Sequence, residues 1–160
     1  MRTAAFVTYN TLGDRFLSSG WHDREDRRAL VLQNTRGRSW AADQAIAKSS
    51  GQYDQECDTV RSEISDLWGQ LQEHLHELDI IVIYVGSNGS EHAIALAANL
   101  PASKVIFVSC DCNLSAKRNA VQRTGLTEAR WIDCECGGHQ TMGRLYNVFM
   151  RGELLTRAAN

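Results

Sequence analysis

Ile80–Gly86 reads IIVIYVG, and Lys104–Ser109 reads KVIFVS. Neither stretch alternates between apolar and polar residues, as a strand with one solvated face would. Short, unbroken apolar runs are typical of strands that are buried on both faces of a parallel sheet. These two stretches therefore predict the centre of a parallel sheet, and with it an α/β fold.

Three weaker strand candidates extend this sheet. Thr3–Tyr9 is the first along the chain, Ala29–Gln33 is the second and could equally be helical, and Ala129–Asp133 is the fifth. A helical pattern follows each strand, which favours a mainly parallel five-stranded sheet with helices on both faces. Five such units suit a three-layer α/β/α sandwich of the flavodoxin-like or Rossmann-like kind. The strand order 2-1-3-4-5 is favoured, and 3-2-1-4-5 stays open.

The helical patterns differ in strength. The strongest lies in Tyr53–Leu78, where apolar residues at steps of three and four predict a helix of about 25 residues whose stripe packs on the sheet. A coiled-coil partner for this stripe is the alternative. The remaining predicted helices are a short one closed by Ser19-Gly20, Glu91–Leu100 before Pro101, Leu114–Thr124 before Gly125, and His139 to about Arg157, with Met142, Leu145, Tyr146, Val148 and Phe149 facing inward.

Length and composition limit the class of protein. The 160 residues predict a single domain, 1–160, and an apolar fraction of 43% with a charged fraction of 22% is ordinary for globular chains. A net charge of −2 gives no general attraction to nucleic acid or anionic membranes. The longest apolar run, Ile80–Val85, is too short to span a bilayer, and Thr3–Tyr9 is too short for a leader. Five cysteines favour a reducing cytoplasm over a secreted disulfide framework.

The candidate ligand site lies where the strand order reverses. In open α/β sheets, ligands bind beyond the carboxyl ends of the strands at that point, here between the first and third strands. The loop Gly86–His92 precedes a helix, so its backbone N–H groups suit a phosphate or carboxylate. It lacks the P-loop and dinucleotide fingerprints, and Asn88 with Glu91 could instead form a capping box. The expected ligand contacts in and opposite this loop are Asn10, Thr11, Ser87, Asn88, Gly89 and Ser90.

Two arginines add to this candidate site. Arg36 and Arg38 flank a glycine in a loop predicted at the same edge, with Trp40 nearby. A guanidinium group and an indole ring can hold the phosphate and the base of a nucleotide. The alternative is a solvated charged loop without a ligand.

Glu91 carries the enzymatic alternative. It follows a predicted strand and opens a predicted helix. In this it resembles TIR-type and nucleoside-deoxyribosyltransferase-type domains, in which a glutamate beside the sheet contacts the ribose or attacks the anomeric carbon. The resemblance covers one strand–loop–helix unit and implies N-glycosidic bond cleavage or transfer on a nucleoside or NAD-like substrate, with Glu91 as the catalytic residue.

The cysteines form two Cys-x-Cys motifs, Cys110/Cys112 and Cys134/Cys136, with His139 close behind. Four thiolates, or three with His139, would satisfy tetrahedral zinc. One intervening residue is shorter than the usual zinc spacing, so unliganded thiols are favoured over a metal site, and a disulfide or redox pair is the third interpretation.

The sequence therefore predicts a small-ligand-binding α/β domain for a nucleotide or another phosphate-bearing molecule, in a sensing or accessory role. The nucleotide is the only cofactor indicated, and zinc is disfavoured. N-glycosidic chemistry through Glu91 is one alternative. A protein-interaction module that self-associates through its helices, as a homodimer for example, is the other. Whether the protein is an enzyme stays open.

Overall fold

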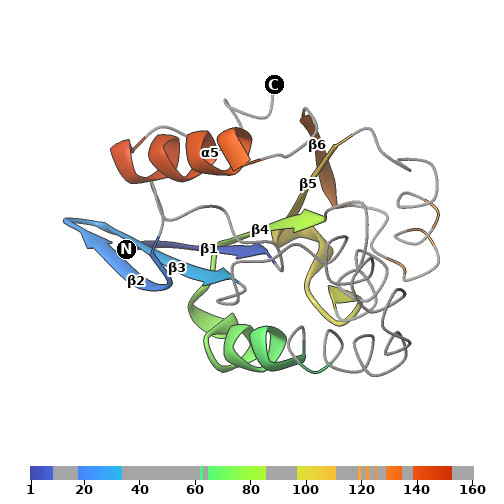
Figure 1. Ribbon diagram of the computed structural model, residues 1–160. Coiled ribbons are helices and arrows are strands. Elements are labelled where there is room, and N and C mark those ends of the chain that lie inside the picture. Colours follow the sequence, from blue (N-terminus) through green and yellow to red (C-terminus); the bar gives the residue numbers. More distant parts are fainter. Residues whose placement is uncertain are drawn as a thin grey trace, which may run out of the picture.

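The computed structural model describes residues 1–8, 18–33, 62, 65–85, 97–110, 119, 122, 125, 129–134 and 139–152. Six strands of this part form one sheet in the order β2-β3-β1-β4-β5-β6 (Figure 1). They are β1 (Arg2–Thr8), β2 (Gly20–Arg24), β3 (Arg27–Gln33), β4 (Ile80–Val85), β5 (Val105–Cys110) and β6 (Arg130–Cys134). The fold class is α/β with a mainly parallel sheet, as the sequence predicts.

The order of the complete sheet differs from the predicted five-strand order 2-1-3-4-5. Five strands are parallel and adjoin one another as β3-β1-β4-β5-β6, whereas β2 pairs antiparallel with β3 and forms an additional edge. The sequence pattern gives no sign of β2, because Gly20–Arg24 reads GWHDR and has no apolar run. An edge strand does not need an apolar run, because it has a neighbouring strand on one side only. Charged residues on its open side discourage pairing with other molecules.

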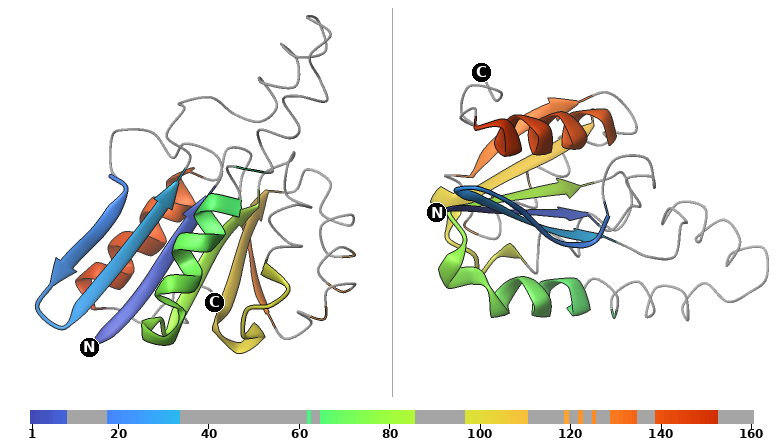
Figure 2. Two further views of the ribbon diagram at one scale, coloured as in Figure 1. Left: turned by 90° about the horizontal axis from the view of Figure 1, so that it is seen from below. Right: turned by 90° about the vertical axis from the view of Figure 1, so that its left-hand side faces the viewer.

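Helical segments lie on the two faces of the sheet (Figure 2). Residues 65–73 are α-helical on one face, and α5 (His139–Arg151) crosses the other. The predicted helix through Leu78 ends too late: the chain turns at His74, tightens into the 3-10 turn η1 (Leu75–Glu77) and is extended at Leu78. The chain must reverse there to enter β4, and a 3-10 turn is a common way to end a helix.

Three further boundaries differ from the predictions. Helix α5 ends at Arg151 rather than near Arg157, because Gly152 adopts a left-handed φ of 92° that ends helices. Helical structure before Pro101 ends at Ala97 instead of Leu100, and Lys104 belongs to a 3-10 turn, η2 (Ala102–Lys104), rather than to β5.

The core consists of two apolar clusters, one on each face of the sheet. On one face Trp68, Leu71 and Leu78 pack against alternate residues of the central strands. On the other face Met142, Leu145 and Phe149 of α5 do so. The predicted sheet-facing stripe and the inward face of α5 are thus confirmed for the described residues, with Leu67, Leu75 and Tyr146 only partly buried. Among the described residues, no helix is long and apolar enough to cross a bilayer.

Candidate functional site

The strand order reverses at β1. The chain passes from β1 to β3 on one side, and later enters β4 on the other side of β1. The carboxyl ends of β1 and β4 adjoin, since Thr8 is the register partner of Tyr84. The segments that follow the two strands therefore start from neighbouring points, as the predicted crevice requires.

The side chains predicted to line this crevice lie outside the described residues. This applies to Asn10, Thr11, Arg36, Arg38, Ser87, Asn88, Gly89, Ser90 and Glu91. The described structure thus gives the position of the two strand ends, and both the crevice and its ligand contacts stay predictions.

The paired cysteine motifs are described in part. Cys110 ends β5 and Cys134 ends β6, and the two are register partners on neighbouring strands. Cys112 and Cys136 lie outside the described residues, and His139 is the first residue of α5. The described residues contain no group of three or more side chains able to hold a metal ion. The preference for unliganded thiols over zinc stays a prediction.

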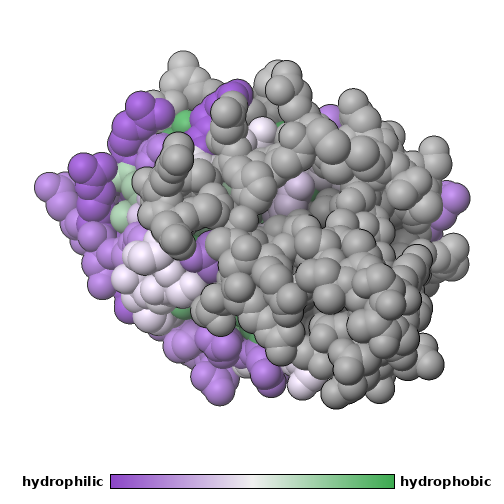
Figure 3. Space-filling view, in the orientation of Figure 1, coloured by the Kyte–Doolittle hydropathy of each residue, from purple (hydrophilic) through white to green (hydrophobic). Residues whose placement is uncertain are grey.

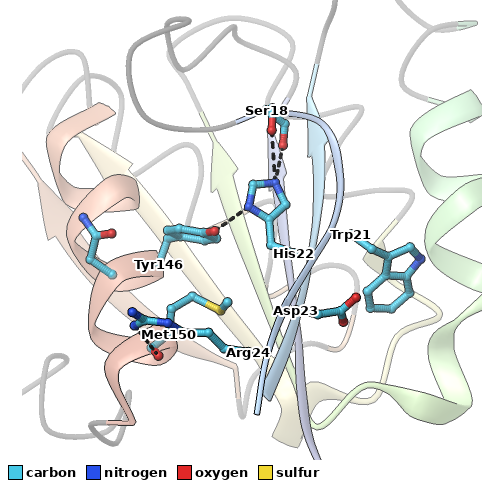
Figure 4. Close-up of a pocket in the computed structure, with 8 residues that line it drawn as sticks. Ser18, Trp21, His22, Asp23, Arg24, Tyr146 and Met150 are labelled. Carbon is cyan, nitrogen blue, oxygen red and sulfur yellow. Dashed lines mark hydrogen bonds between the residues drawn. The ribbon is translucent and has the colours of Figure 1, made fainter. Parts of the chain in front are cut away.

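A pocket that the sequence does not suggest lies between the edge strand β2 and helix α5 (Figure 4). It has a volume of about 550 Å³ and opens to solvent. Its lining is mostly polar: Ser18, Trp21, His22, Asp23, Arg24, Tyr146, Asn147 and Met150. The nearby tip of the β2–β3 hairpin is a strongly hydrophilic surface (Figure 3).

The alternation of β2 divides its side chains between two environments. His22 is the register partner of Ala29, which belongs to the core cluster beneath α5. Trp21 is the partner of Leu30, which belongs to the cluster on the opposite face. Since side chains alternate along a strand, His22 and Arg24 lie on the α5 side of the sheet and Trp21 lies on the other.

His22 connects β2 to α5 and to the chain before β2. Its Nδ1 lies 2.5 Å from the hydroxyl oxygen of Tyr146, and its Nε2 lies 2.6 Å from the carbonyl oxygen of Ser18. A carbonyl oxygen can only accept, so Nε2 carries a proton. In the neutral ring Nδ1 is then the acceptor, and Tyr146 donates its hydroxyl proton to it.

Tyr146 is held from two sides. Its ring packs edge-on against Phe6 of β1, at 5.6 Å between centroids, and edge-on against His22 at 5.3 Å. Burial raises the pKa of Tyr146 above its usual value, and the nearby Arg24 guanidinium opposes this rise only in part. Tyr146 therefore keeps its proton at neutral pH and acts as a hydrogen-bonding group, not as a phenolate nucleophile.

Arg24 differs from the neighbouring arginines. Arg28 pairs with Asp23 at 2.7 Å, and Arg27 pairs with Asp26 at 3.1 Å. Within the described part of the chain no carboxylate reaches Arg24, which donates only to the carbonyl oxygen of Met150, at 3.3 Å. Among the described residues, this carbonyl oxygen is thus the one hydrogen-bond partner given for its five N–H donors.

No protein-family model, curated protein or solved structure matches this chain.

A second, smaller cavity of about 290 Å³ lies on the other side of β2. Trp21 forms one wall, with the Arg28 guanidinium 4.1 Å above its ring and His74 edge-on at 5.1 Å. His74 also contacts Glu77 at 3.0 Å. Arg28 and His74 thus both contact the indole of Trp21. On this side of β2 the side chains bind one another, and these contacts join the β2–β3 hairpin to η1.

Sequence reasoning missed the β2–α5 pocket for a physical reason. His22 and Tyr146 are 124 residues apart, and neither belongs to a motif. Tyr146 occurs in the inward pattern of its helix and looks like an ordinary core residue. The sequence offers one local indication of β2, which is the aromatic pair Trp21 and His22 directly after Gly20. This pattern can be interpreted as the start of a strand only when its partner, β3, is known.

Proposed function

We propose that this chain binds a small phosphate-bearing molecule, a nucleotide being the leading candidate, in the crevice at the carboxyl ends of β1 and β4. The role is sensing or accessory. We also propose that the sheet and its two helical layers form a three-layer sandwich of the flavodoxin-like kind, since the parallel strands adjoin as β3-β1-β4-β5-β6. The five cysteines support a reducing cytoplasm as its location.

One observation carries the proposal: the strand order reverses between β1 and β4. At such a point the connections leave in opposite directions, so that a gap opens between the loops above the sheet. The sequence at that gap has small, hydroxyl and amide residues before a predicted helix, which supports binding of an anionic group.

A thermal-shift panel of nucleotides and sugar phosphates tests this proposal. A ligand present at about a hundred times its Kd stabilises the folded state by about 2.7 kcal/mol, which raises the melting temperature by several degrees. Asn88→Ala and Arg36→Gln should reduce the shift given by the best ligand.

Arg144→Gln is the matched control for Arg36→Gln. Arg144 is exposed on α5, makes no ion pair with a described residue and should leave the ligand shift unchanged. A panel in which no compound raises the melting temperature of the wild-type protein would contradict the proposal.

A further inference from the structure

The β2–α5 pocket brings together two groups able to bind an oxyanion, and a third group that is hydrogen-bonded to one of them. Arg24 supplies a positive charge without a carboxylate partner among the described residues. Tyr146 supplies a hydroxyl group, and His22 lies directly behind that hydroxyl. Tyr146 and Met150 are one helical turn apart, so the hydroxyl and the guanidinium held at the Met150 carbonyl lie on the same side of α5 (Figure 4).

We propose that this pocket is an anion site for the phosphate group of a small ligand, and that anion binding there takes up one proton at His22. The oxyanion accepts hydrogen bonds from Arg24 and from the hydroxyl of Tyr146. The site is distinct from the crevice of the proposed function, since β3 and β1 stand between β2 and β4 in the sheet.

The direction of the Tyr146–His22 hydrogen bond couples anion binding to proton uptake at His22. With a neutral imidazole, Tyr146 gives its only proton to Nδ1 and has none left for an anion. When the ring is protonated, Nδ1 becomes a donor to the Tyr146 oxygen, and the hydroxyl proton is released toward the pocket. Nε2 donates to the Ser18 carbonyl in both states, so the ring keeps its orientation.

The charges around His22 favour this coupling. From α5 it faces Tyr146, which is neutral, and from its own strand it has Arg24 and Asp23 nearby. Asp23 is already paired with Arg28. Protonation of His22 thus adds a second positive charge beside that of Arg24, and an oxyanion bound between them would offset the repulsion between the two.

Sulfate is the appropriate probe, because its charge does not change across the range in which histidine titrates. Calorimetric titration should show binding that strengthens from about pH 8 to about pH 5.5, by up to about tenfold per pH unit. Repeating one titration in two buffers of different ionisation enthalpy should reveal proton uptake on binding. Ribose 5-phosphate, titrated in parallel, distinguishes two sources of the oxyanion. Tighter binding than that of sulfate indicates a phosphate ester as the natural ligand, whereas equal binding indicates the free ion.

Three variants separate the roles of the side chains. Arg24→Gln should weaken sulfate binding by about tenfold at every pH, the loss expected for one hydrogen bond to a charged group. Tyr146→Phe should weaken it only at low pH, where the hydroxyl is released, and His22→Gln should abolish the pH dependence. Arg144→Gln, an exposed arginine on the same helix, should behave as wild type.

Circular dichroism of each variant checks that the fold persists. Three results would overturn the proposal: sulfate binding with no pH dependence, sulfate binding that Arg24→Gln leaves intact, or no saturable binding at about pH 5.5. None of these results would contradict ligand binding at the ends of β1 and β4. An equal loss in Tyr146→Phe at high and low pH would also overturn the coupling.

Discussion

The hydrogen bond between Tyr146 and His22 should have a measurable coupling energy. Tyr146→Phe removes the hydroxyl group 2.5 Å from Nδ1 but keeps the ring that packs against Phe6. His22→Ala removes the acceptor together with its bond to Ser18. A double-mutant cycle over these two positions isolates the hydroxyl–imidazole interaction, because the aromatic ring is present in both forms of residue 146.

The magnitude follows from the burial of the pair. A net hydrogen bond contributes about 0.5–1.5 kcal/mol, and this one is short but partly exposed, so water can replace either partner. We therefore expect Tyr146→Phe to lower the free energy of unfolding by about 1 kcal/mol, or roughly 2–4 °C in melting temperature for a chain of this length. The coupling energy should be of the same size.

Urea denaturation at pH about 7.5, followed by circular dichroism, measures all four corners of the cycle. At this pH most imidazole rings are neutral, the state in which Tyr146 donates. If the two single losses add to the double loss within about 0.3 kcal/mol, the side chains are independent and the account of their bond is wrong.

Three other predictions follow from particular residues. Because the folded-state pKa of Tyr146 is raised, stability should be complete below the ordinary tyrosine pKa and fall as pH rises above it; denaturation at increasing alkaline pH should show a smaller fall in Tyr146→Phe. Gly152→Ala should cost more stability in urea than Gly125→Ala, since both glycines have a positive φ but only at Gly152 would a Cβ lie 2.3 Å from the Arg27 guanidinium, which must then shift; equal losses would contradict the prediction by showing that this shift has no cost. Incubation with nucleosides or NAD should release no base if the protein only binds, whereas release that Glu91→Gln abolishes in a folded variant would favour the N-glycosidic hypothesis.

The buried parts of the fold could be predicted from the sequence because their signal is local. Unbroken apolar runs identified β4 and β5, and helical spacing identified the faces of Trp68 and Leu71 that pack on the sheet. Such patterns depend only on which side chains must leave water.

The features missed were those set by contacts distant in the sequence. Strand β2 has no apolar run, and it is a strand because its backbone pairs with β3. The ends of the helix at residue 73 and of α5 at Arg151 depend on a turn into β4 and on the left-handed Gly152. The pocket that contains His22 and Tyr146 exists because the edge of the sheet lies under α5. This arrangement cannot be predicted from any local sequence pattern.

Binding of a nucleotide at the crevice is tested most directly by mapping it onto the backbone. Adenosine monophosphate titrated into isotopically labelled protein should give saturable amide shifts at the ends of β1 and β4, around Thr8, Tyr84 and Val85. The central claim would be contradicted if neither adenosine monophosphate nor any other nucleotide or sugar phosphate in the panel gave saturable amide shifts at these strand ends.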